Sequence, residues 1–423
     1  MVYKNKSRDS KNVLAILAGG GPAPGINGVI SAATIEAMNQ GVEVIGIRDG
    51  FKWIAQADKK HILKLTIENT SRIHLTGGSV LGISRENPTR SAQKMNNVIR
   101  TLKALKVKFL LTIGGDDTMF TASRVEAEAK GALKVAHVPK TIDNDLPLPG
   151  YSSTFGFETG RHLGTRIVQY LMEDARTTSR WHLVVTMGRK TGHLALGIGK
   201  AAGATVSIIP EDFADRKITL GTLITLLEGA IIKRMSMGRQ DGVAIVAEGL
   251  AEKLEETEFE DLKDVERDAH GNIRLSEIDL GKVLKNETKR RLAEKGINIT
   301  IVNKNIGYEL RSAPPIPFDA NYTRDLGYGA IKFLLQGGTG AMITIQTGKM
   351  VPLNFKELLD PETGRTKIRY VDVNTESYEV AEKYMIKLTE EDLHNRAALA
   401  RLSRTARMKP EEFVKYFSKA LRY

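Results

Sequence analysis

The chain contains no cysteine among its 423 residues, and aromatic residues make up only 6% of it. The lack of cysteine excludes disulfide bonds and cysteine-ligated metal sites, although it does not identify a cellular compartment. The scarcity of aromatic side chains is unfavourable for stacking on nucleic-acid bases. No apolar run approaches the roughly eighteen residues of a membrane span, and the N-terminus shows no signal-peptide pattern. We therefore expect a soluble, cytoplasmic protein with no membrane partner.

Basic residues outnumber acidic residues by 62 to 50, which gives a net charge of +12. Such a surplus is typical of proteins that bind nucleic acid, membrane surfaces or phosphorylated small molecules. The basic residues are spread along the whole chain, without an arginine-rich arm, a zinc finger, an RNP-like motif or a helix-turn-helix pattern. We therefore favour a small anionic ligand over nucleic acid.

Apolar runs of strand length alternate with segments of helix length. Strands are expected at 13–18, 42–47, 107–113, 133–138, 183–187, 205–209, 243–247 and 342–345, and helices at 26–40 and 118–130. Most runs lack polar alternation, as is typical of strands buried on both faces, so the pattern predicts a doubly wound α/β fold. Two regions differ from this pattern: 250–290 is charge-dense and indicates a solvated loop or helical insert, and 375–423 indicates a polar helical extension packed on the outside.

Two adjacent carboxylates, Asp116 and Asp117, follow a Gly114-Gly115 turn at the end of an expected strand. Open α/β sheets bind ligands at the carboxyl ends of their strands, where a glycine turn before a helix forms a platform for phosphate. A carboxylate in this position usually holds Mg²⁺. One carboxylate is enough for that, so we expect the second to influence which phosphate donor fits.

A glycine-rich loop over 19–28 follows the first strand. Gly20 and Gly21 carry no Cβ atom, so the backbone N–H groups can approach an anion at the start of the next helix. The loop is neither a P-loop nor a dinucleotide-binding fingerprint, and a tight turn without a ligand is an alternative interpretation.

A polar loop bounded by prolines, 139–147, follows the strand expected to end at residue 138. It contains Lys140, Thr141, Asp143 and Asp145, and polar groups at a strand end are costly unless they bind something. One carboxylate could accept a hydroxyl proton, and another could help to hold Mg²⁺. The alternative is a turn that satisfies its own backbone, and Lys140 argues against it.

Five weaker motifs are each compatible with an ordinary surface turn when taken alone. They are 77–85 ending in Arg85, 176–180 ending in Arg180, Met187-Gly188-Arg189, Glu248-Gly249, and Tyr308 with Arg311. None of the eight histidines has metal-ligand spacing, and His137 is more typical of a hydrogen-bonded core residue than of a ligand. No nucleophile motif is present.

Taken in chain order, these motifs resemble the phosphofructokinase family, and specifically its pyrophosphate-dependent branch. The resemblance runs from about Val13 to about Gly327 and rests on several ordered motifs at strand ends. It implies two doubly wound three-layer α/β/α lobes with mostly parallel sheets and an active site in the cleft between them. The donor lobe is expected over 1–154 with a return at about 312–370, and the sugar-phosphate lobe over 155–311, with 371–423 as a helical C-terminal extension.

The resemblance also implies roles at the matching positions. Asp143 is expected to be the general base for the 1-hydroxyl of fructose 6-phosphate, assisted by Lys140, Thr141 and Arg189. The remaining expected roles are donor binding by Gly20, Gly21, Arg85, Gly115, Asp117 and Lys140; Mg²⁺ binding by Asp116 and Asp145; sugar binding by Met187, Gly188, Arg189 and Glu248; and 6-phosphate binding by Tyr308 and Arg311. Arg180 matches a residue that reaches the substrate from a neighbouring subunit, so a homo-oligomer, dimer or tetramer, is expected.

The expected phosphate donor depends on two of these positions. ATP-using relatives carry glycine at the position of Asp117, and here a carboxylate would repel and block the α-phosphate of the nucleotide. Lys140 replaces a small residue and supplies positive charge for pyrophosphate. The sequence departs from the pattern of the ATP enzymes at Val302, where they carry arginine, and Lys304 is a candidate substitute. The alternatives are ATP as donor, an acceptor such as sedoheptulose 7-phosphate, and a non-catalytic phosphosugar or nucleotide sensor.

Overall fold

The computed structural model describes residues 12–150, 152–214, 216–255 and 279–421. The chain forms two compact units, Met1–Gly160 with Tyr308–Arg369 (unit 1), and Arg161–Gly307 with Tyr370–Tyr423 (unit 2). Most of the charge-dense segment predicted at 250–290 lies outside the described residues, as does the short lead-in before residue 12. The two units are described separately below.

Unit 1 is built on one sheet in the order β12-β11-β5-β4-β1-β2-β3, with β6 paired to β5. The strands are β1 (Val13–Ala18), β2 (Glu43–Ile47), β3 (Ile62–Leu65), β4 (Val107–Gly114), β5 (Lys134–Thr141), β6 (Phe155–Gly156), β11 (Ala341–Gln346) and β12 (Lys349–Asn354). The central strands are parallel, whereas β3 and β12 run antiparallel to their neighbours. The carboxyl ends of β1, β4 and β5 therefore meet at one edge of the sheet.

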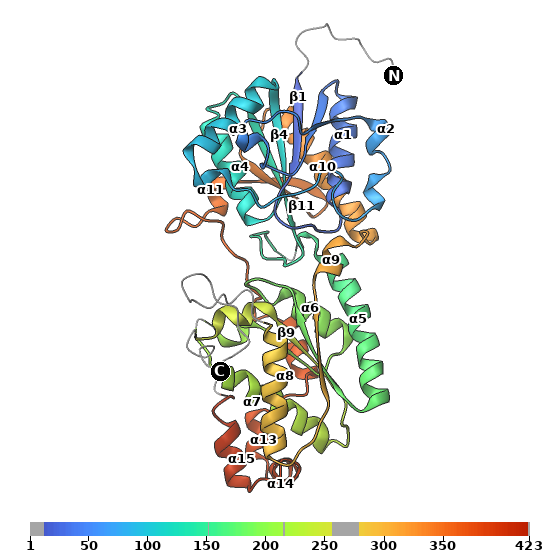
Figure 1. Cartoon of the computed structure of the whole chain (residues 1–423), viewed down its shortest axis with the longest axis vertical. Coiled ribbons are helices and arrows are strands. Elements are labelled where there is room, and N and C mark those ends of the chain that lie inside the picture. The colour runs from blue at the N-terminus through green and yellow to red at the C-terminus, as the bar shows by residue number, and fades with distance from the viewer. Residues whose placement is uncertain (1–11, 151, 215, 256–278, 422–423) are drawn as a thin grey trace. The chain divides into compact units, whose positions relative to one another are not determined.

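Helices cover both faces of this sheet. Successive residues of a strand point to opposite faces, so each central strand contributes apolar side chains to a core on either side. In β1, Ala15 and Leu17 join one apolar cluster, while Leu14 and Ile16 join another. The first cluster includes residues of α3 (Ala92–Ala104) and α4 (Asp116–Glu128), and the second includes residues of α1 (Ile26–Asn39) and α10 (Pro317–Leu335) (Figure 1). The short helices of unit 1 are α2 (Ile67–Thr70), α9 (Tyr308–Ser312) and α11 (Phe355–Leu358).

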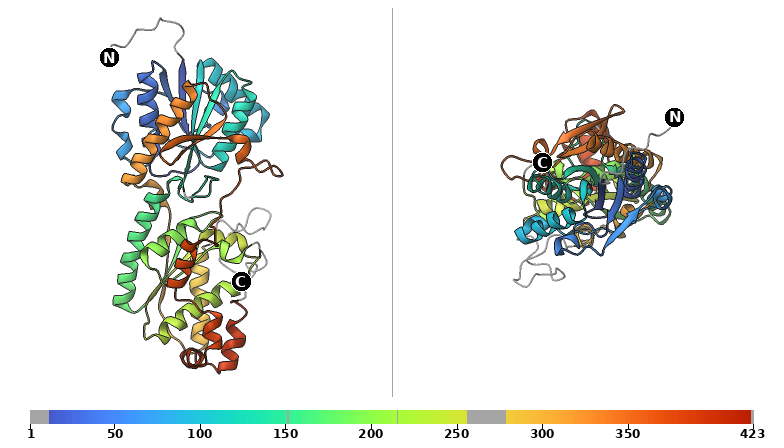
Figure 2. Two further views of the ribbon diagram at one scale, coloured as in Figure 1. Left: turned by 180° about the vertical axis from the view of Figure 1, so that it is seen from behind. Right: turned by 90° about the horizontal axis from the view of Figure 1, so that it is seen from above.

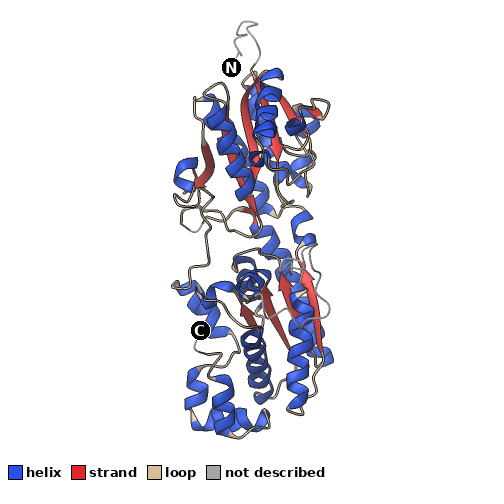
Figure 3. Cartoon of the chain, turned by 60° about the vertical axis from the view of Figure 1, so that its left-hand side comes forward, coloured by secondary structure: helices blue, strands red, loops and turns tan. Residues whose placement is uncertain are grey.

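Unit 2 contains a parallel sheet in the order β10-β7-β9-β8. Its strands are β7 (Trp181–Thr186), β8 (Val206–Ile208), β9 (Gly242–Ala247) and β10 (Ile301–Ile306). Its main helices are α5 (Phe157–Thr178), α6 (His193–Ala202), α7 (Leu220–Ser236) and α8 (Leu280–Glu294). The first turn of α5 still belongs to unit 1. The sheet lies between helices, as Figure 3 shows by colour. Gly199 of α6 packs so closely on this sheet that a Cβ atom would lie 2.0 Å from Ser207 Oγ.

The C-terminal segment of unit 2 folds into α12 (Glu376–Tyr384), α13 (Glu390–His394), α14 (Arg396–Thr405) and α15 (Pro410–Phe417). The helical character predicted for 375–423 is therefore present. The segment was expected to pack on the outside of the protein, but it also contributes to the core of unit 2. Phe413 and Phe417 are almost completely buried in the same apolar cluster as residues of α7 and α8. The helices α13, α14 and α15, drawn in red, lie at one end of unit 2 in Figure 2.

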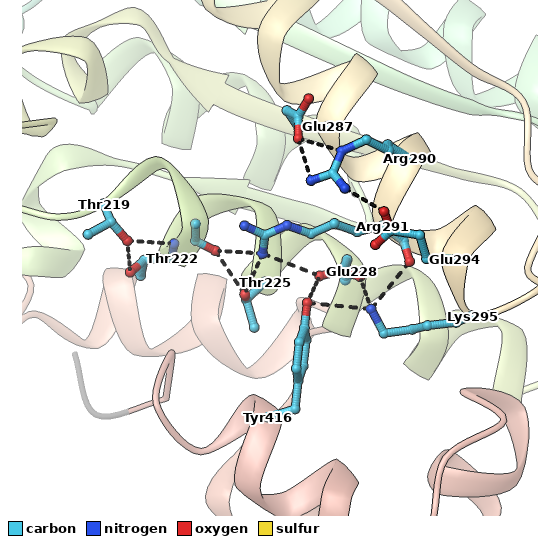
Figure 4. Close-up of polar contacts among 11 residues, drawn as sticks. Thr219, Thr222, Thr225, Glu228, Glu287, Arg290, Arg291, Glu294, Lys295 and Tyr416 are labelled. Atoms are coloured by element: carbon cyan, nitrogen blue, oxygen red, sulfur yellow. Dashed lines mark hydrogen bonds and ion pairs between the residues drawn. The ribbon is translucent and has the colours of Figure 1, made fainter. Parts of the chain in front are cut away.

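A buried carboxylate joins the last of these helices, α15, to α7 and α8 (Figure 4). Glu228 of α7 is 0% exposed, and its Oε1 lies 2.7 Å from the Nζ of Lys295. The Tyr416 hydroxyl of α15 donates to Glu228 Oε2 at 2.8 Å, and the Arg291 guanidinium of α8 lies 3.8 Å away. Since a buried charge is costly without partners, this network favours the one packing in which all its members meet.

Every strand expected from the sequence is present, and the predicted α/β architecture of mostly parallel sheets is confirmed. Four further strands, β3, β6, β10 and β12, were not expected from the sequence. β3 and β6 are short, β10 carries the polar run Asn303-Lys304-Asn305, and β12 is an edge strand that contains Pro352. The strand expected to end at residue 138 continues to Thr141, so Lys140 belongs to β5 and not to a loop.

Among the described residues, the structure has no helix that is both long enough and apolar enough to cross a membrane.

Candidate active site

The glycine-rich loop after β1 lies at the strand-end edge of the unit 1 sheet. The Gly19 N–H donates to Ile113 O of β4, and the Gly20 N–H donates to Ser84 O, both at 2.9 Å. Gly20 has φ +82°, a backbone conformation that residues with a side chain rarely adopt. The loop is thus joined both to β4 and to the segment that ends in the exposed Arg85.

Thr118 packs beneath two of the glycines at this edge. A Cβ atom on Gly19 would lie 2.5 Å from Thr118 Oγ1, and one on Gly114 would lie 2.3 Å from Thr118 Cβ. Gly115 then precedes α4, whose first turn carries the exposed Asp116 and Asp117. The glycines therefore allow the ends of β1 and β4 to approach the start of α4 directly.

Lys140 places a buried ammonium group beside the glycine-rich loop. Its side chain is almost fully buried, and its Nζ donates to Gly21 O at 2.5 Å. Burial, together with the nearby Arg311, lowers the pKa of Lys140 to about 8, although the neighbouring aspartates oppose this shift. The Arg311 guanidinium itself lies over Gly21, since a Cβ atom there would be 3.3 Å from Arg311 Cζ. Two cationic side chains thus converge on this loop.

Three carboxylates gather after β5 and at the start of α4. Burial, together with the nearby charges of Asp143 and Asp116, raises the pKa of Asp145 to about 7. The side chain of Thr141 hydrogen-bonds the Asp145 carboxylate, and its Oγ1 accepts the Asp143 N–H at 3.0 Å. Repulsion between these acids favours a cation among them.

These acids fit a Mg²⁺ ion that is held mainly by phosphate oxygens. Such an ion needs only one or two protein carboxylates and keeps its other positions for substrate and water. Asp116 is close enough to Asp145 to raise its pKa. Among the described residues, no group of three or more acidic or histidine side chains could hold a metal ion by itself.

His137 lies beneath this edge of the sheet and is fully buried. One ring nitrogen contacts Thr112 Oγ1 at 2.8 Å and the other contacts Gly114 O at 3.0 Å. Burial lowers the pKa of His137 to about 3, so the ring is neutral near pH 7. The interpretation of His137 as a hydrogen-bonded core residue is confirmed.

In unit 2, candidate residues meet at the carboxyl ends of β7 and β9, which are adjacent parallel strands. Met187 follows β7, and the exposed Glu248 follows β9. The turns are in contact, because a Cβ atom on Gly249 would lie 3.0 Å from Gly188 O. Arg189 is exposed on the same loop. Unit 2 thus gathers Met187, Gly188, Arg189 and Glu248 at one edge.

Arg180 lies at the opposite end of β7, immediately before its first residue. Its Nε donates to Thr178 Oγ1 at 2.6 Å and lies 3.7 Å from Asp174 Oδ2. The six residues of β7 span about 20 Å, so Arg180 is remote from Met187 within its own chain.

Tyr308 and Arg311 belong to unit 1, whereas the sequence analysis assigned them to the lobe over 155–311. Both are on α9, and the packing of its end against the first unit explains the difference: a Cβ atom on Gly77 would lie 2.0 Å from Ser312 O. Tyr308 is 78% exposed, whereas Arg311 lies beside Gly21.

Two supporting residues were missed by the sequence analysis. Glu211 accepts the Gly192 N–H at 3.0 Å and the Val371 N–H at 3.0 Å, so it braces the loop that follows Arg189. Burial raises the pKa of Glu211. Arg369 makes several hydrogen bonds to the loop that carries Asp143 and Asp145. No local pattern marks either residue, because their partners are distant in sequence.

Comparison with known proteins gives relatives over nearly the whole chain. The sequence is 54% identical to the pyrophosphate–fructose 6-phosphate 1-phosphotransferase of Thermotoga maritima over 96% of this chain and 97% of that protein. It is 47% identical to the protein of the same name from Naegleria fowleri, over 96% of each.

Solved structures support the same fold. The pyrophosphate-dependent phosphofructokinase of Nitrosospira multiformis aligns with a TM-score of 0.68 at 18% identity, over 89% of this chain and 91% of that one. The phosphofructokinase of Saccharomyces cerevisiae aligns with a TM-score of 0.67 at 21% identity over 97% of this chain, which spans 50% of the yeast chain. The sequence profile described as Phosphofructokinase matches residues 13–334. With most of its length matched, and with its glycine loops and acidic cluster at the strand ends, this chain belongs to the phosphofructokinase family.

Proposed function

We propose that this protein transfers a phosphoryl group from pyrophosphate to the 1-hydroxyl of fructose 6-phosphate, giving fructose 1,6-bisphosphate and phosphate. The observation that carries the proposal is the 54% identity, over 96% of the chain, to a relative named for this activity. The chemistry of the unit 1 site supports it, because a buried Lys140 and a glycine-rich loop suit a small, highly charged donor. The reaction is reversible in this proposal and serves glycolysis or gluconeogenesis.

Asp143 acts as the general base in the proposed mechanism. Its carboxylate takes the proton of the sugar 1-hydroxyl as that oxygen forms a bond to the transferred phosphorus atom. The bond between the phosphorus and the bridging oxygen of pyrophosphate breaks, and phosphate leaves. A positioned base contributes roughly 10²–10⁴-fold to such a step. Thr141 supports this role because its Oγ1 accepts the Asp143 N–H and fixes the turn.

The donor is held by the backbone of Gly20, Gly21 and Gly115 and by the side chains of Lys140 and Arg85. Most of the catalytic effect in phosphoryl transfer comes from positioning and from neutralising charge. Asp116 and Asp145 are the proposed ligands of Mg²⁺, which offsets the negative charge of the phosphates when it is bound. Lys140 adds a positive charge that water screens only weakly, because the group is buried.

Asp117 excludes ATP in this proposal. It stands in the first turn of α4 beside the donor platform, with an exposed carboxylate. An α-phosphate that approached this turn would meet a like charge, whereas pyrophosphate ends before that point. Discrimination through repulsion fits a donor that lacks a nucleoside.

The sugar phosphate is held by Met187, Gly188, Arg189 and Glu248 of unit 2, and its 6-phosphate by Tyr308 and Arg311. Arg189 suits the paired hydrogen bonds that anionic oxygens accept. Arg180 is separated from these residues by the length of β7, which supports a role toward the substrate of a neighbouring subunit. A homo-oligomer follows from this part of the proposal, and an active monomer would contradict it.

Parallel assays test the proposal. Formation of fructose 1,6-bisphosphate is measured by coupled oxidation of NADH, with Mg²⁺, fructose 6-phosphate, and either pyrophosphate or ATP. Turnover with pyrophosphate and little or none with ATP is expected. Faster turnover with ATP would overturn the donor assignment, turnover of sedoheptulose 7-phosphate in preference to fructose 6-phosphate would overturn the acceptor, and binding without turnover would indicate a sensor.

A further inference from the structure

The loop that carries Asp143 and Asp145 is held by an arginine that lies far away in the sequence. Arg369 is the last residue of unit 1, and its partly buried guanidinium points into this loop. Its Nη1 donates to Ser152 O at 2.7 Å and to Leu148 O at 3.3 Å. Its Nε and Nη2 donate to Asn144 O at 3.1 Å and 3.0 Å. One side chain thus joins the beginning and the end of the loop.

Two further hydrogen bonds come from the backbone of Arg369 and from the side chain of Thr366, three residues earlier. The Arg369 N–H donates to Asp145 O at 2.8 Å. The hydroxyl of Thr366, a buried residue, donates to Asp116 O at 3.3 Å. The segment 366–369 therefore contacts the backbone of both proposed Mg²⁺ ligands, which come from different loops.

Asn144, between Asp143 and Asp145, accepts three of the hydrogen bonds that the Arg369 side chain donates. It has φ +57°, a left-handed conformation that asparagine and aspartate adopt more readily than other residues with a side chain. Its Oδ1 accepts the Thr154 N–H at 2.9 Å and also a hydrogen bond from Arg369 Nη2. The reversal of the chain at Asn144 sets the direction of the carboxylates on either side, so fixing Asn144 fixes both.

We infer that Arg369 is a positioning residue that sets the geometry between the catalytic base Asp143 and the metal ligands Asp145 and Asp116. This inference rests on the proposed function. Arg369 acts through backbone carbonyls and is not itself a catalytic group. Its planar guanidinium suits the task, since it donates to three carbonyl oxygens that lie in different directions. A lysine ammonium keeps the charge but cannot reproduce this set of bonds.

The test compares Arg369→Ala and Arg369→Lys with the matched control Arg365→Ala, whose exposed side chain lies immediately before the segment 366–369. We expect kcat with pyrophosphate to fall roughly a hundredfold in Arg369→Ala, because small displacements of reacting groups carry penalties of this size. Arg369→Lys should lose at least tenfold. The KM for fructose 6-phosphate should change less than about threefold, because the proposed base and metal ligands affect the reacting centre more than sugar binding. Arg365→Ala should behave as the wild type.

A binding measurement supplies a readout that does not depend on turnover. Titration of the full chain with Mn²⁺ in the presence of pyrophosphate, followed by electron paramagnetic resonance, reports the affinity of the metal site. We expect about a tenfold weaker affinity in both Arg369 variants, in line with the effect of residues that orient metal ligands. Added guanidinium ion at millimolar concentration should restore part of the kcat of Arg369→Ala, and circular dichroism checks that each variant is folded.

The outcomes separate this inference from the proposed function. A wild-type enzyme that is inactive with pyrophosphate refutes the proposed function itself. An active wild type together with a folded Arg369→Lys that keeps normal kcat and Mn²⁺ affinity refutes the positioning role, even if Arg369→Ala does not fold. A rise in KM alone, or an equal loss in Arg365→Ala, also refutes it.

Discussion

Loss of the charge on Lys140 should limit catalysis on the alkaline side. The group is buried against Gly21, and burial brings its pKa down to about 8. It is therefore charged at pH 7 and becomes neutral as the pH rises through about 8. At pH 9 only about a tenth of the free enzyme would carry the charge, so loss of the Lys140 charge alone should lower kcat/KM for pyrophosphate roughly tenfold between pH 7 and pH 9.

The profile of kcat should differ from that of kcat/KM. Bound pyrophosphate favours the charged ammonium and raises the pKa of Lys140, so the fall in kcat should appear at higher pH. The fall in activity on the acid side of the pH profile should come from protonation of Asp145, because burial and neighbouring acids raise the pKa of Asp145 to about 7. More Mg²⁺ should shift that acid limb to lower pH, since the bound cation favours the ionised carboxylate.

The variant Lys140→Met tests the assignment directly. A hydrogen bond to a charged group contributes about 1.5–3 kcal/mol, so kcat/KM for pyrophosphate should fall roughly 10–150-fold at pH 7. The alkaline limb near pH 8 should vanish while the acid limb stays. Lys59→Met, at an exposed position in the same unit, is the control and should keep the wild-type profile. The reasoning is refuted if Lys140→Met keeps an alkaline limb at the same pH, or if the wild type shows none up to pH 9.5.

Three further predictions concern the base, the donor and the C-terminal helices. Asp143→Asn should lower kcat roughly 10²–10⁴-fold without changing the circular dichroism spectrum, and near-normal turnover would contradict its role as base. The double variant Asp117→Gly with Lys140→Gly should gain activity with ATP and lose most of its activity with pyrophosphate; unchanged donor preference in the two assays would refute the donor argument. Tyr416→Phe should cost about 1.5–3 kcal/mol, because it removes a hydrogen bond to the buried Glu228 carboxylate, and a melting temperature equal to that of the wild type would contradict this.

Part of the candidate site was predictable from the sequence because its motifs are local. The glycine-rich loop and the acidic turn at Asp116 each follow a buried strand, the segment from Lys140 to Asp145 spans the end of another, and parallel strands bring their carboxyl ends to one edge. The doubly wound fold was predictable for the same reason, since strands buried on both faces leave continuous apolar runs. The roles given to these residues remain predictions.

The residues that hold the site in place were decided only by the tertiary structure. Arg369 lies 225 positions from Asn144, and Tyr416 lies 188 positions from Glu228, so no sequence period links either pair. The placement of Tyr308 and Arg311 in unit 1 likewise depends on the return of the chain after unit 2.

The sequence by itself determined a doubly wound α/β fold of mostly parallel strands and the chemistry at the strand ends, because hydrophobic periodicity and turn composition act over a few neighbouring residues. It also determined family membership, through ordered motifs along most of the chain. Only the tertiary structure decided where β5 ends, how polar strands such as β10 pair, and which distant side chains brace the acidic loop. Those features depend on hydrogen bonds and packing between segments that are far apart in sequence, and such contacts leave no local pattern.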